Sequence, residues 1–459
     1  MKPSIPVLTA LALAYFHPDA GCLPAGAAES PDPFLPAKKL TAQIFDSNYH
    51  QGHDTYNGMG TASDGRIYYV LSTEPHDIGG RMFVFDPKTQ KVSPVGDLTE
   101  ACGEKGKNTV VQGKSHVNFV EADGKLFFAT HIGFYSLIDG MEKMGIPPPG
   151  WKPYPGGHLL SYDPKSGKFD DLAMAPEGEG VITFNMDTKR NRMFGVTWPA
   201  GMFFRYDLAT KNMKNFGKTC REGENGKGAA YSTVCRSIPV DPDDGSAYYS
   251  TGDGEIFQYS AATDSVAKIE DEDLRKDYFG TYDSTNPGHM GYNWRQTFYR
   301  PKDKMIYGVH GNSGYLFRFD PRSKRVEVLD RITSDVSKRS GMFDQFSYGY
   351  LGFALGADGD TIYYLTGGPI YVNGKRLKGK DRIAMGAAKG LEDLHLVTYH
   401  IPTGHCKDQG AIYYPNGERP LYVNSIAVGL DGSVYSLARV PDKSRVRADL
   451  FCVKGPFTP

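Results

Sequence analysis

Two histidines of this sequence stand where they could exchange protons with a substrate. His116, in KSHVN, precedes a short predicted strand, and His131, in THIGFY, follows the next strand. Since adjacent antiparallel strands end close together, we expect the two imidazoles to lie within about one side chain of each other. Such a pair can act as general acid and base or hold a metal ion. Arg236, in VCRS, and Arg295, in GYNWRQ, could bind a carboxylate or sulfate in a bidentate manner.

Aromatic and polar residues accompany these groups in comparable loops. The aromatic residues that offer flat faces for sugar rings are Tyr135, Trp198, Tyr292 and Trp294. The further polar candidates for substrate binding are His53, Asn118, His310 and Asn312. Tyr56 and Asn424 lie in loops of the same kind. Together these residues exceed what loop closure alone demands, and they predict a binding site.

A repeated phrase indicates which elements position these residues. The copies are FVFDPKTQKV (83–92), LLSYDPKSGKF (159–169), FFRYDLATKNM (203–213), IFQYSAATDSV (256–266), LFRFDPRSKRV (316–326) and LVTYHIPTGHC (396–406). Each copy is an apolar strand, a tight turn and a second strand, and a second hairpin precedes each. Four-strand units that recur about every 40–45 residues are typical of a β-propeller. With a seventh unit at 424–453, the sequence predicts an all-β, seven-bladed β-propeller.

Composition agrees with many short strands joined by turns. The chain has 54 Gly, 30 Pro and 12% aromatic residues, and no long stretch has apolar residues at helical spacing. The segment KLTAQIF (39–45) is apolar and β-prone, so we expect it to complete the last blade beside LFCVKG (450–455). Without that strand the last sheet would keep an open edge.

Propeller geometry brings the candidate residues to one rim. In each blade, the loop before the innermost strand and the loop between the second and third strands lie on the same face of the disc. His116 and Arg236 belong to loops of the first kind, and His131 and Trp198 to loops of the second kind. We therefore predict that His116 and Arg236 face one cavity, with His131 beside His116. The opposite rim consists of plain turns.

This set of residue types favours one class of chemistry. Glycoside hydrolases need two carboxylates at a fixed separation, and the acidic residues of this rim are scattered over different blades. Cleavage of a uronic-acid chain by β-elimination needs other groups. A cation neutralises the C6 carboxylate, a His or Tyr removes the C5 proton, and a neighbouring group protonates the leaving oxygen. The rim supplies those groups.

Three segments resemble a known family. KSHVNFVEADGKLFFATHIGFY (114–135), MFGVTWPAGMFFRYD (193–207) and NWRQTFYRPKDKMIYGVHGNSGYLFRFDP (293–321) are similar to seven-bladed propeller lyases that degrade ulvan, a sulfated uronic-acid polysaccharide of green algae. The resemblance implies a site of two His from one blade, an Arg two blades further on and a Tyr. His116, His131 and Arg236 match the first three. Near the expected place of the Tyr this chain has Trp198, Phe203 and Phe204.

The leading hypothesis is therefore a polysaccharide lyase acting on an acidic polysaccharide. Arg236 would clamp the carboxylate, His116 would take or relay the C5 proton, and the second proton transfer would fall to His131 or Tyr292. The residues expected to line subsites are Trp198, Trp294, Arg295 and His310. One alternative is a non-catalytic propeller that binds a glycan or a protein. Another is a metal-dependent hydrolase or lactonase using His116, His131 and His310. The elimination itself requires no cofactor, and the sequence is compatible with a bound divalent metal.

The N-terminus predicts export. Residues 1–27 have the length and the small residues before Ala28 that a cleaved signal peptide requires, which leaves 28–459 as one propeller domain. We expect a secreted or periplasmic monomer without a membrane span. Cys22 follows Ala20-Gly21 as in a lipoprotein processing site, but Asp19 stands where an apolar residue is usual, so a lipid anchor is the less favoured alternative. A net charge of −1 argues against nucleic acid as partner.

An oxidising compartment also permits disulfides. The candidate pair is Cys220 and Cys235, because a bond there would close the Gly-rich insertion REGENGKGAAYSTV. A loop of this composition cannot order itself by burial, so we expect the bond to hold it over the rim.

Overall fold

The computed structural model describes residues 38–458, with gaps at 54–55, 140, 288, 336–337, 339–351, 368–370, 373–374, 377–393 and 443–446. The predicted signal peptide and Cys22 lie outside the described residues. The helical segments are α1 (Leu98–Ala101), η1 (Pro176–Gly178), η2 (Gly223–Asn225), η3 (Gly228–Ala230) and η4 (Asp277–Phe279). In the described segments, every helix falls short of the length and apolarity that a membrane crossing requires.

Strands make up most of the described chain. One sheet contains β2 (Met59–Thr61), β3 (Ile67–Leu71), β4 (Arg81–Asp86) and β5 (Lys91–Asp97). The next contains β6 (Val120–Ala122), β7 (Lys125–Ala129), β10 (His158–Asp163) and β11 (Lys168–Met174). The next contains β12 (Gly180–Asp187), β13 (Arg192–Trp198), β14 (Met202–Asp207) and β15 (Asn212–Lys218).

The second half of the chain continues the same pattern. A three-stranded sheet contains β16 (Ala247–Ser250), β17 (Glu255–Ser260) and β18 (Ser265–Asp273). A four-stranded sheet contains β19 (Trp294–Arg300), β20 (Met305–His310), β21 (Tyr315–Asp320) and β22 (Arg325–Arg331). An eight-stranded sheet has the order β23 (Gly352–Leu355), β24 (Thr361–Thr366), β27 (His395–His400), β28 (His405–Tyr413), β1 (Lys39–Phe45), β31 (Arg447–Val453), β30 (Val434–Val440) and β29 (Ala427–Val428). Two small hairpins are β8 (Tyr135–Ile138) with β9 (Met141–Met144), and β25 (Tyr371–Val372) with β26 (Lys375–Arg376).

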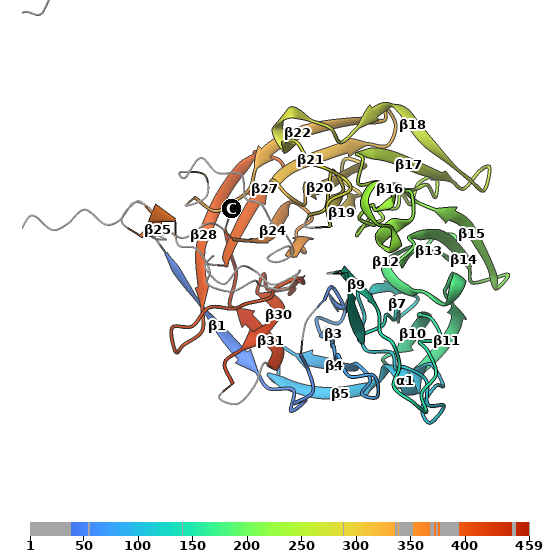
Figure 1. Cartoon of the computed structure of the whole chain (residues 1–459). Helices are drawn as coiled ribbons and strands as arrows, with labels where there is room; N and C mark the ends of the chain where they lie inside the picture. The colour runs from blue at the N-terminus through green and yellow to red at the C-terminus, as the bar shows by residue number, and fades with distance from the viewer. Residues whose placement is uncertain are drawn as a thin grey trace, which may run out of the picture.

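The sheets follow one another around a common centre, as Figure 1 shows, with β5, β11, β15, β18 and β22 at the outside. This radial arrangement of antiparallel sheets is that of propeller-type folds, and the predicted all-β class is confirmed. Neighbouring sheets pack through aromatic residues, such as Phe203 against Tyr249 with ring centroids 4.9 Å apart. Every residue of β3 is buried, because both faces of that strand meet other sheets.

The six repeated phrases form the outermost hairpin of six units. Asp86 pairs with Lys91 and Asp320 with Arg325 across turns of four residues. The Asp86 carboxylate accepts the backbone N–H of Lys88 at 2.8 Å, which fixes the turn. The last turn residues all have positive φ: Gln90, Gly167, Lys211, Asp264, Lys324 and Gly404. The hairpins predicted from these phrases are confirmed.

Strand β1 joins the two ends of the described chain. It pairs in parallel with β28, Lys39 opposite Ala411, and in antiparallel with β31, Ala42 opposite Val453. The expectation that KLTAQIF completes the last unit beside LFCVKG is confirmed. Because β1 pairs on both sides, neither β28 nor β31 presents an open edge along these residues.

The predicted disulfide is wrong: Cys220 and Cys235 are both free thiols in this structure. The Cys220 sulfur lies 3.5 Å from Oδ2 of Asp253. Cys235, which is 1% exposed, donates instead to the carbonyl oxygen of Ser237 at 3.2 Å. The two sulfurs therefore have different partners on different segments.

Hydrogen bonds order the insertion that the disulfide was expected to hold. Its backbone bonds include Glu222 N–H to Ala230 O at 3.2 Å and Ser232 N–H to Gly223 O at 3.0 Å. Glu224 adds a bond to the backbone N–H of Val234 at 3.0 Å. The disulfide prediction failed because the sequence does not reveal that the Glu224 carboxylate accepts hydrogen bonds that hold this loop.

Candidate functional site

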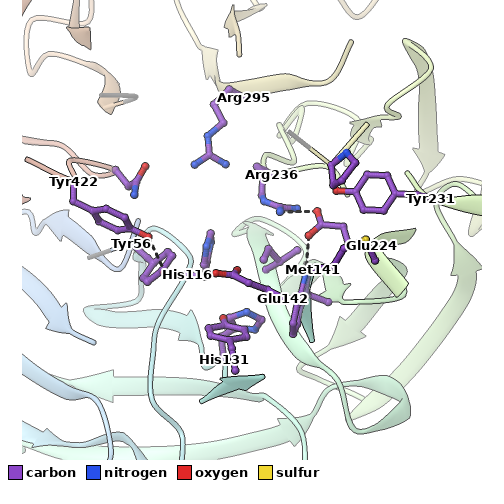
Figure 2. Close-up of a pocket in the computed structure, with 15 residues that line it drawn as sticks. Tyr56, His116, His131, Met141, Glu142, Glu224, Tyr231, Arg236, Arg295 and Tyr422 are labelled. Atoms are coloured by element: carbon purple, nitrogen blue, oxygen red, sulfur yellow. Dashed lines mark hydrogen bonds and ion pairs between the residues drawn. The ribbon is translucent and has the colours of Figure 1, made fainter. Parts of the chain in front are cut away.

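A cavity at the centre of the propeller-type ring gathers much of the predicted site (Figure 2). Its lining residues are Tyr56, His116, His131, Tyr135, Met141, Glu142, Ile182, Trp198, Glu224, Tyr231, Arg236, Pro287, Arg295, Tyr422 and Asn424. His116, His131, Tyr135, Trp198, Arg236 and Arg295 belong to both the predicted and the observed set. The predicted sharing of one cavity by His116 and Arg236 is present.

Backbone pairing around Lys114 positions the two histidines. The N–H of Lys114 donates to the carbonyl of His131 at 3.0 Å, and the N–H of His131 donates back at 2.8 Å. Residues directly opposite on an antiparallel pair project to one side, and so does the residue two further along. Lys114, His116 and His131 therefore share a side, and the two imidazole centroids lie 5.6 Å apart.

Both imidazoles are buried and neutral at neutral pH. Burial, followed by His131 and then by the positive charges of Arg236, Arg295 and Lys114, holds the pKa of His116 well below its ordinary value. Burial and the charges of Lys114 and Arg236 do the same to the pKa of His131. Each Nδ1 is buried without a hydrogen-bond partner among the described residues. A neutral imidazole can accept a proton, so both rings are in the form that a base requires.

Gly180, the first residue of β12, leaves room for His131. An added Cβ at Gly180 would lie 2.0 Å from Nδ1 of His131, closer than any van der Waals contact allows. The other side of the His131 ring meets Trp198, with centroids 5.5 Å apart at an interplanar angle of 80°. The ring is therefore held between a strand backbone and an indole.

Glu224 holds Arg236 in place. Nη2 of Arg236 donates to Oε1 of Glu224 at 2.6 Å, and Nη1 donates to the carbonyl of Val234 at 2.7 Å. The other oxygen of Glu224 accepts the indole N–H of Trp198 at 2.8 Å. Glu224 and Tyr231 both come from the insertion at 220–235, so this loop forms a wall of the cavity. The loop thus reaches the predicted site, although no disulfide holds it there.

A lysine and a tyrosine complete the opposite wall. Nζ of Lys114, whose residue is 0% exposed, donates to the hydroxyl of Tyr56 at 2.7 Å. The same Nζ lies 4.0 Å from the ring centroid of Tyr56 and 4.4 Å from that of Tyr135. The Tyr56 ring in turn contacts His116, with centroids 4.6 Å apart. The lysine charge is thus stabilised by two aromatic faces and a hydroxyl.

The charges around the cavity leave a positive excess. Arg236 and Arg295 line it as cations, and Glu142 and Glu224 line it as carboxylates. Lys114 adds a third cation behind Tyr56. With the two histidines neutral, three cations and two carboxylates sum to one positive charge. Such a cavity suits a ligand with a single carboxylate.

Two predicted aromatic residues lie elsewhere. Trp294 is 0% exposed, and its indole N–H donates to the carbonyl of Ser237 at 2.8 Å, so it is a core residue with no face for a sugar. The hydroxyl of Tyr292 accepts the backbone N–H of Tyr282 at 3.2 Å, and Tyr292 does not line the cavity that holds His116. The expectation of a sugar platform at Trp294 and of a proton-transfer role for Tyr292 is corrected.

Four predicted polar residues also lie outside the cavity. His310 stacks on Phe279 at 4.3 Å, and Asn312 donates to the carbonyl of Gly291 at 2.6 Å; both are buried. His53 lies 3.3 Å from Glu74. Asn118 lines a second pocket that shares His116 and Arg236 with the first one. None of these four residues is among those that line the cavity.

Lys114, Glu142, Glu224, Tyr231 and Tyr422 line or support the cavity without having been predicted. Lys114 had a readable signal, because it stands two residues before His116 in the loop predicted to enter an innermost strand. Glu224 had no such signal, because it meets its partner Arg236 only after the insertion has folded.

The described residues contain no group of three or more His, Cys, Asp or Glu side chains positioned to hold one metal ion. His310 in particular does not lie with His116 and His131. The ligand set anticipated for a metal-dependent hydrolase is therefore not assembled.

No protein-family model matches this chain, and no curated protein sequence matches it. Among solved structures, a chain of a mitotic checkpoint complex has 12% identity and a TM-score of 0.47, over 97% of this chain and 99% of that one. A candidate 6-phosphogluconolactonase from Bacteroides uniformis has 9% identity and a TM-score of 0.42, over 76% and 83%. A protein of unknown function from Bacteroides thetaiotaomicron has 12% identity and a TM-score of 0.40, over 91% and 98%.

Proposed function

We propose that this protein is an exported polysaccharide lyase that cleaves a uronic-acid-containing, ulvan-like glycan by β-elimination. One observation carries the proposal: two neutral, buried histidines share a cavity with Arg236 and Arg295. Neutral bases beside fixed cations are the combination needed to remove a proton adjacent to a carboxylate.

The proposed scaffold is a seven-bladed propeller acting as a monomer. The eight-stranded sheet counts as two blades, β23-β24-β27-β28 and β29-β30-β31-β1, joined by the parallel pair of β28 and β1. The other five larger sheets count as one blade each.

Arg236 is proposed to bind the C6 carboxylate, with Arg295 as its second cation. Nη2 of Arg236 donates to Glu224 and Nη1 to the carbonyl of Val234, so the guanidinium is a fixed positive charge beside which the substrate carboxylate would bind. Neutralising that carboxylate stabilises the enolate-like charge that develops when C5 loses its proton. One preorganised contact of this kind contributes about two to three orders of magnitude in rate.

His116 is proposed to remove the C5 proton. Burial, with further contributions from His131, Arg236, Arg295 and Lys114, keeps the pKa of His116 low and its ring neutral. A bound carboxylate offsets these positive charges, so the basicity of His116 rises when substrate is present. His131, held against Gly180, keeps the His116 ring oriented. The base is thus unprotonated before binding and stronger after it.

The test is the formation of an unsaturated uronate. The mature protein is incubated with a panel of uronic-acid polysaccharides, sulfated and unsulfated, while the ultraviolet absorbance of the C4–C5 double bond is recorded. We expect product from at least one polymer and none from neutral glycans. Arg236→Ala and His116→Ala should each lower the rate by about a hundredfold or more.

Matched variants control for general damage. Arg322 is an exposed turn residue and His405 is the exposed first residue of β28, and neither lines the cavity, so His405→Ala and Arg322→Ala are expected to keep the wild-type rate. A binding propeller would retain glycan affinity and give no unsaturated product from any polymer. A metal-dependent hydrolase would cleave without forming the double bond and would lose activity with a chelator. Export is tested separately, by sequencing the N-terminus of secreted protein, which should begin at Ala28.

A further inference from the structure

The proposed elimination lacks a group that protonates the leaving oxygen. When the C4–O bond breaks, the departing sugar hydroxyl needs a proton. Trp198, Phe203 and Phe204, near the position where a tyrosine would be expected, have no hydroxyl and are 3%, 0% and 0% exposed. His116 is committed to the C5 proton, and the Nδ1 of His131 is packed against Gly180. The hydroxyls of the cavity lining belong to Tyr56, Tyr135, Tyr231 and Tyr422. That of Tyr135 donates to the carbonyl of Ile132 at 3.0 Å, and that of Tyr231 lies 3.3 Å from the hydroxyl of Thr233.

Tyr56 provides one of these hydroxyls. It lines the cavity, and Figure 2 shows it on the side away from Tyr231, near His116 and Tyr422. Its ring centroid lies 4.6 Å from that of His116, and its hydroxyl lies 3.3 Å from the hydroxyl of Tyr422. The Tyr56 ring therefore lies beside His116 on the same side of the cavity.

Lys114 places a positive charge beside the Tyr56 hydroxyl. Burying an ammonium group is costly unless other groups compensate for the lost water. Here the ammonium donates to the Tyr56 hydroxyl at 2.7 Å and lies over the rings of Tyr56 and Tyr135. A cation at hydrogen-bond distance favours the ionised form of a phenol. Among the described contacts of Tyr56 are those with Lys114, His116 and Tyr422, and the Lys114 ammonium is the cation at hydrogen-bond distance from its hydroxyl.

We propose that Tyr56 donates the proton to the leaving-group oxygen and that Lys114 stabilises the tyrosinate this transfer creates. The role rests on the proposed elimination. His116 takes the C5 proton, the C5–H electron pair forms the C4–C5 double bond, and the C4–O pair leaves with the oxygen. That oxygen takes the hydroxyl proton of Tyr56. The step ends with His116 as imidazolium and Tyr56 as tyrosinate.

The closeness of the His116 and Tyr56 rings also explains how both groups could regain their starting protonation states. The imidazolium of His116 can return its proton to the neighbouring tyrosinate, which restores both groups to neutral without solvent. Until then Lys114 balances the tyrosinate charge. Both transfers act from one side of the sugar ring, so the geometry corresponds to syn elimination. The proposal therefore also predicts which uronate epimers react: those with the C5 hydrogen and the C4 oxygen on the same face.

The experiment compares two leaving groups in the mature full-length chain. The first substrate is the natural polymer, whose sugar alkoxide needs a proton. The second is a uronoside with an aryloxy group at C4, which leaves without one. Tyr56→Phe keeps the ring packing and should lose about two to four orders of magnitude in rate on the polymer. On the aryloxy substrate it should stay within about tenfold of wild type, because that substrate needs no acid.

Lys114→Met tests the catalytic role through the alkaline limb of the pH–rate profile, which a purely structural role of Tyr56 would leave unchanged. Activity of a tyrosine donor falls at the pH where the phenol ionises, so the alkaline limb of the pH–rate profile reports Tyr56. Removing the neighbouring ammonium should shift this limb upward by about one pH unit or more. Tyr278→Phe, at a tyrosine that is 62% exposed, is the matched control and should change neither the rate nor the profile.

The outcomes separate this role from the function itself. A wild-type protein that forms no unsaturated uronate from any polymer overturns the elimination and the role with it. An active wild type whose Tyr56→Phe variant keeps its polymer rate within about threefold overturns the role alone. So does an equal loss on both substrates, which would mean a positioning defect. Circular dichroism and thermal unfolding of each variant identify any loss that comes from misfolding.

Discussion

The imidazole of His131 lies so close to the α-carbon of Gly180 that a Cβ at this residue would be 2.0 Å from Nδ1 and 2.8 Å from Cε1. The two residues belong to adjacent sheets, since His131 follows β7 and Gly180 begins β12. The orientation of a candidate catalytic ring therefore depends on the absence of a side chain in the neighbouring sheet.

Gly180→Ala should rotate His131 away from His116. We expect the elimination rate to fall at least tenfold or so, because His116 loses its orienting neighbour. Crowding should also cost about 1–3 kcal/mol of unfolding free energy. The measurements are the rate of unsaturated uronate formation and urea unfolding. Gly60→Ala, where the new Cβ would have its nearest atom at 3.3 Å, is the control. Wild-type rate and stability in Gly180→Ala would contradict this placement of His131.

Glu224→Gln should destabilise the insertion and the arginine beneath it. The Arg236–Glu224 pair is largely buried, with side chains 5% and 13% exposed, and removing one charge leaves the other uncompensated. Breaking such a pair costs about 3–5 kcal/mol. Thermal unfolding and proteolysis within 220–235 measure the effect. Glu222→Gln in the same loop breaks only an exposed pair with Lys218 and should change stability by less than about 1 kcal/mol.

His158 should make stability depend on pH. Burial lowers the pKa of His158, but hydrogen bonds with Asp171 and Glu104, both at 2.9 Å, outweigh it and raise the pKa to about 9. A raised pKa stabilises the folded state fully below the ordinary value of 6.5, and the contribution disappears as pH rises through about 9.

The corresponding variant is His158→Gln. At mildly acidic pH, the free energy of unfolding of the wild type should exceed that of the variant by about 1–3 kcal/mol, allowing for the 38% exposure of the Asp171 side chain. This difference should shrink toward zero above a pH of about 9. Denaturant unfolding at several pH values measures this. A difference that stays constant across the alkaline range would contradict the assignment.

Peptide mapping checks the free thiols. Without reduction, a digest of alkylated, denatured protein should carry the label on Cys102, Cys220, Cys235, Cys406 and Cys452. Folded protein should react slowly, because burial raises the pKa of Cys220 to about 11 and Cys235 is 1% exposed. A peptide linking Cys220 to Cys235 would reinstate the disulfide and overturn this feature of the structure.

The hairpins and the histidine pair were predictable because they depend on local rules. An Asp that starts a four-residue turn sets the register of its own strands, as at Asp86, and antiparallel pairing brings His116 and His131 together. The direction of neighbouring side chains was harder to predict. Arg295 lines the cavity, whereas Trp294 packs into the core, because successive residues of a strand face opposite sides. The sequence prediction placed both side chains at the same rim, although adjacent residues of one strand cannot both face the cavity.

The remaining misses involve contacts between distant segments. No local pattern pairs Glu224 with Arg236 or Lys114 with Tyr56, since each pair forms only after separate loops reach the axis. The incorrect disulfide prediction has the same origin. The composition of the loop suggested that it needed a covalent constraint, because nothing in the sequence identifies the Glu224 carboxylate as the group that orders it.

The pairing of β1 also sets an order of assembly. Lys39–Phe45 is among the first described strands to be synthesised, yet its partners are His405–Tyr413 and Arg447–Val453. Until nearly the whole chain has emerged, this strand must wait unpaired, and the sheet edges that it later covers stay open to other chains. The ring can close only after synthesis of the last strands. A ribosome stalled before Arg447 would thus hold a protein with exposed strand edges, prone to aggregate, however well its middle sheets had already formed.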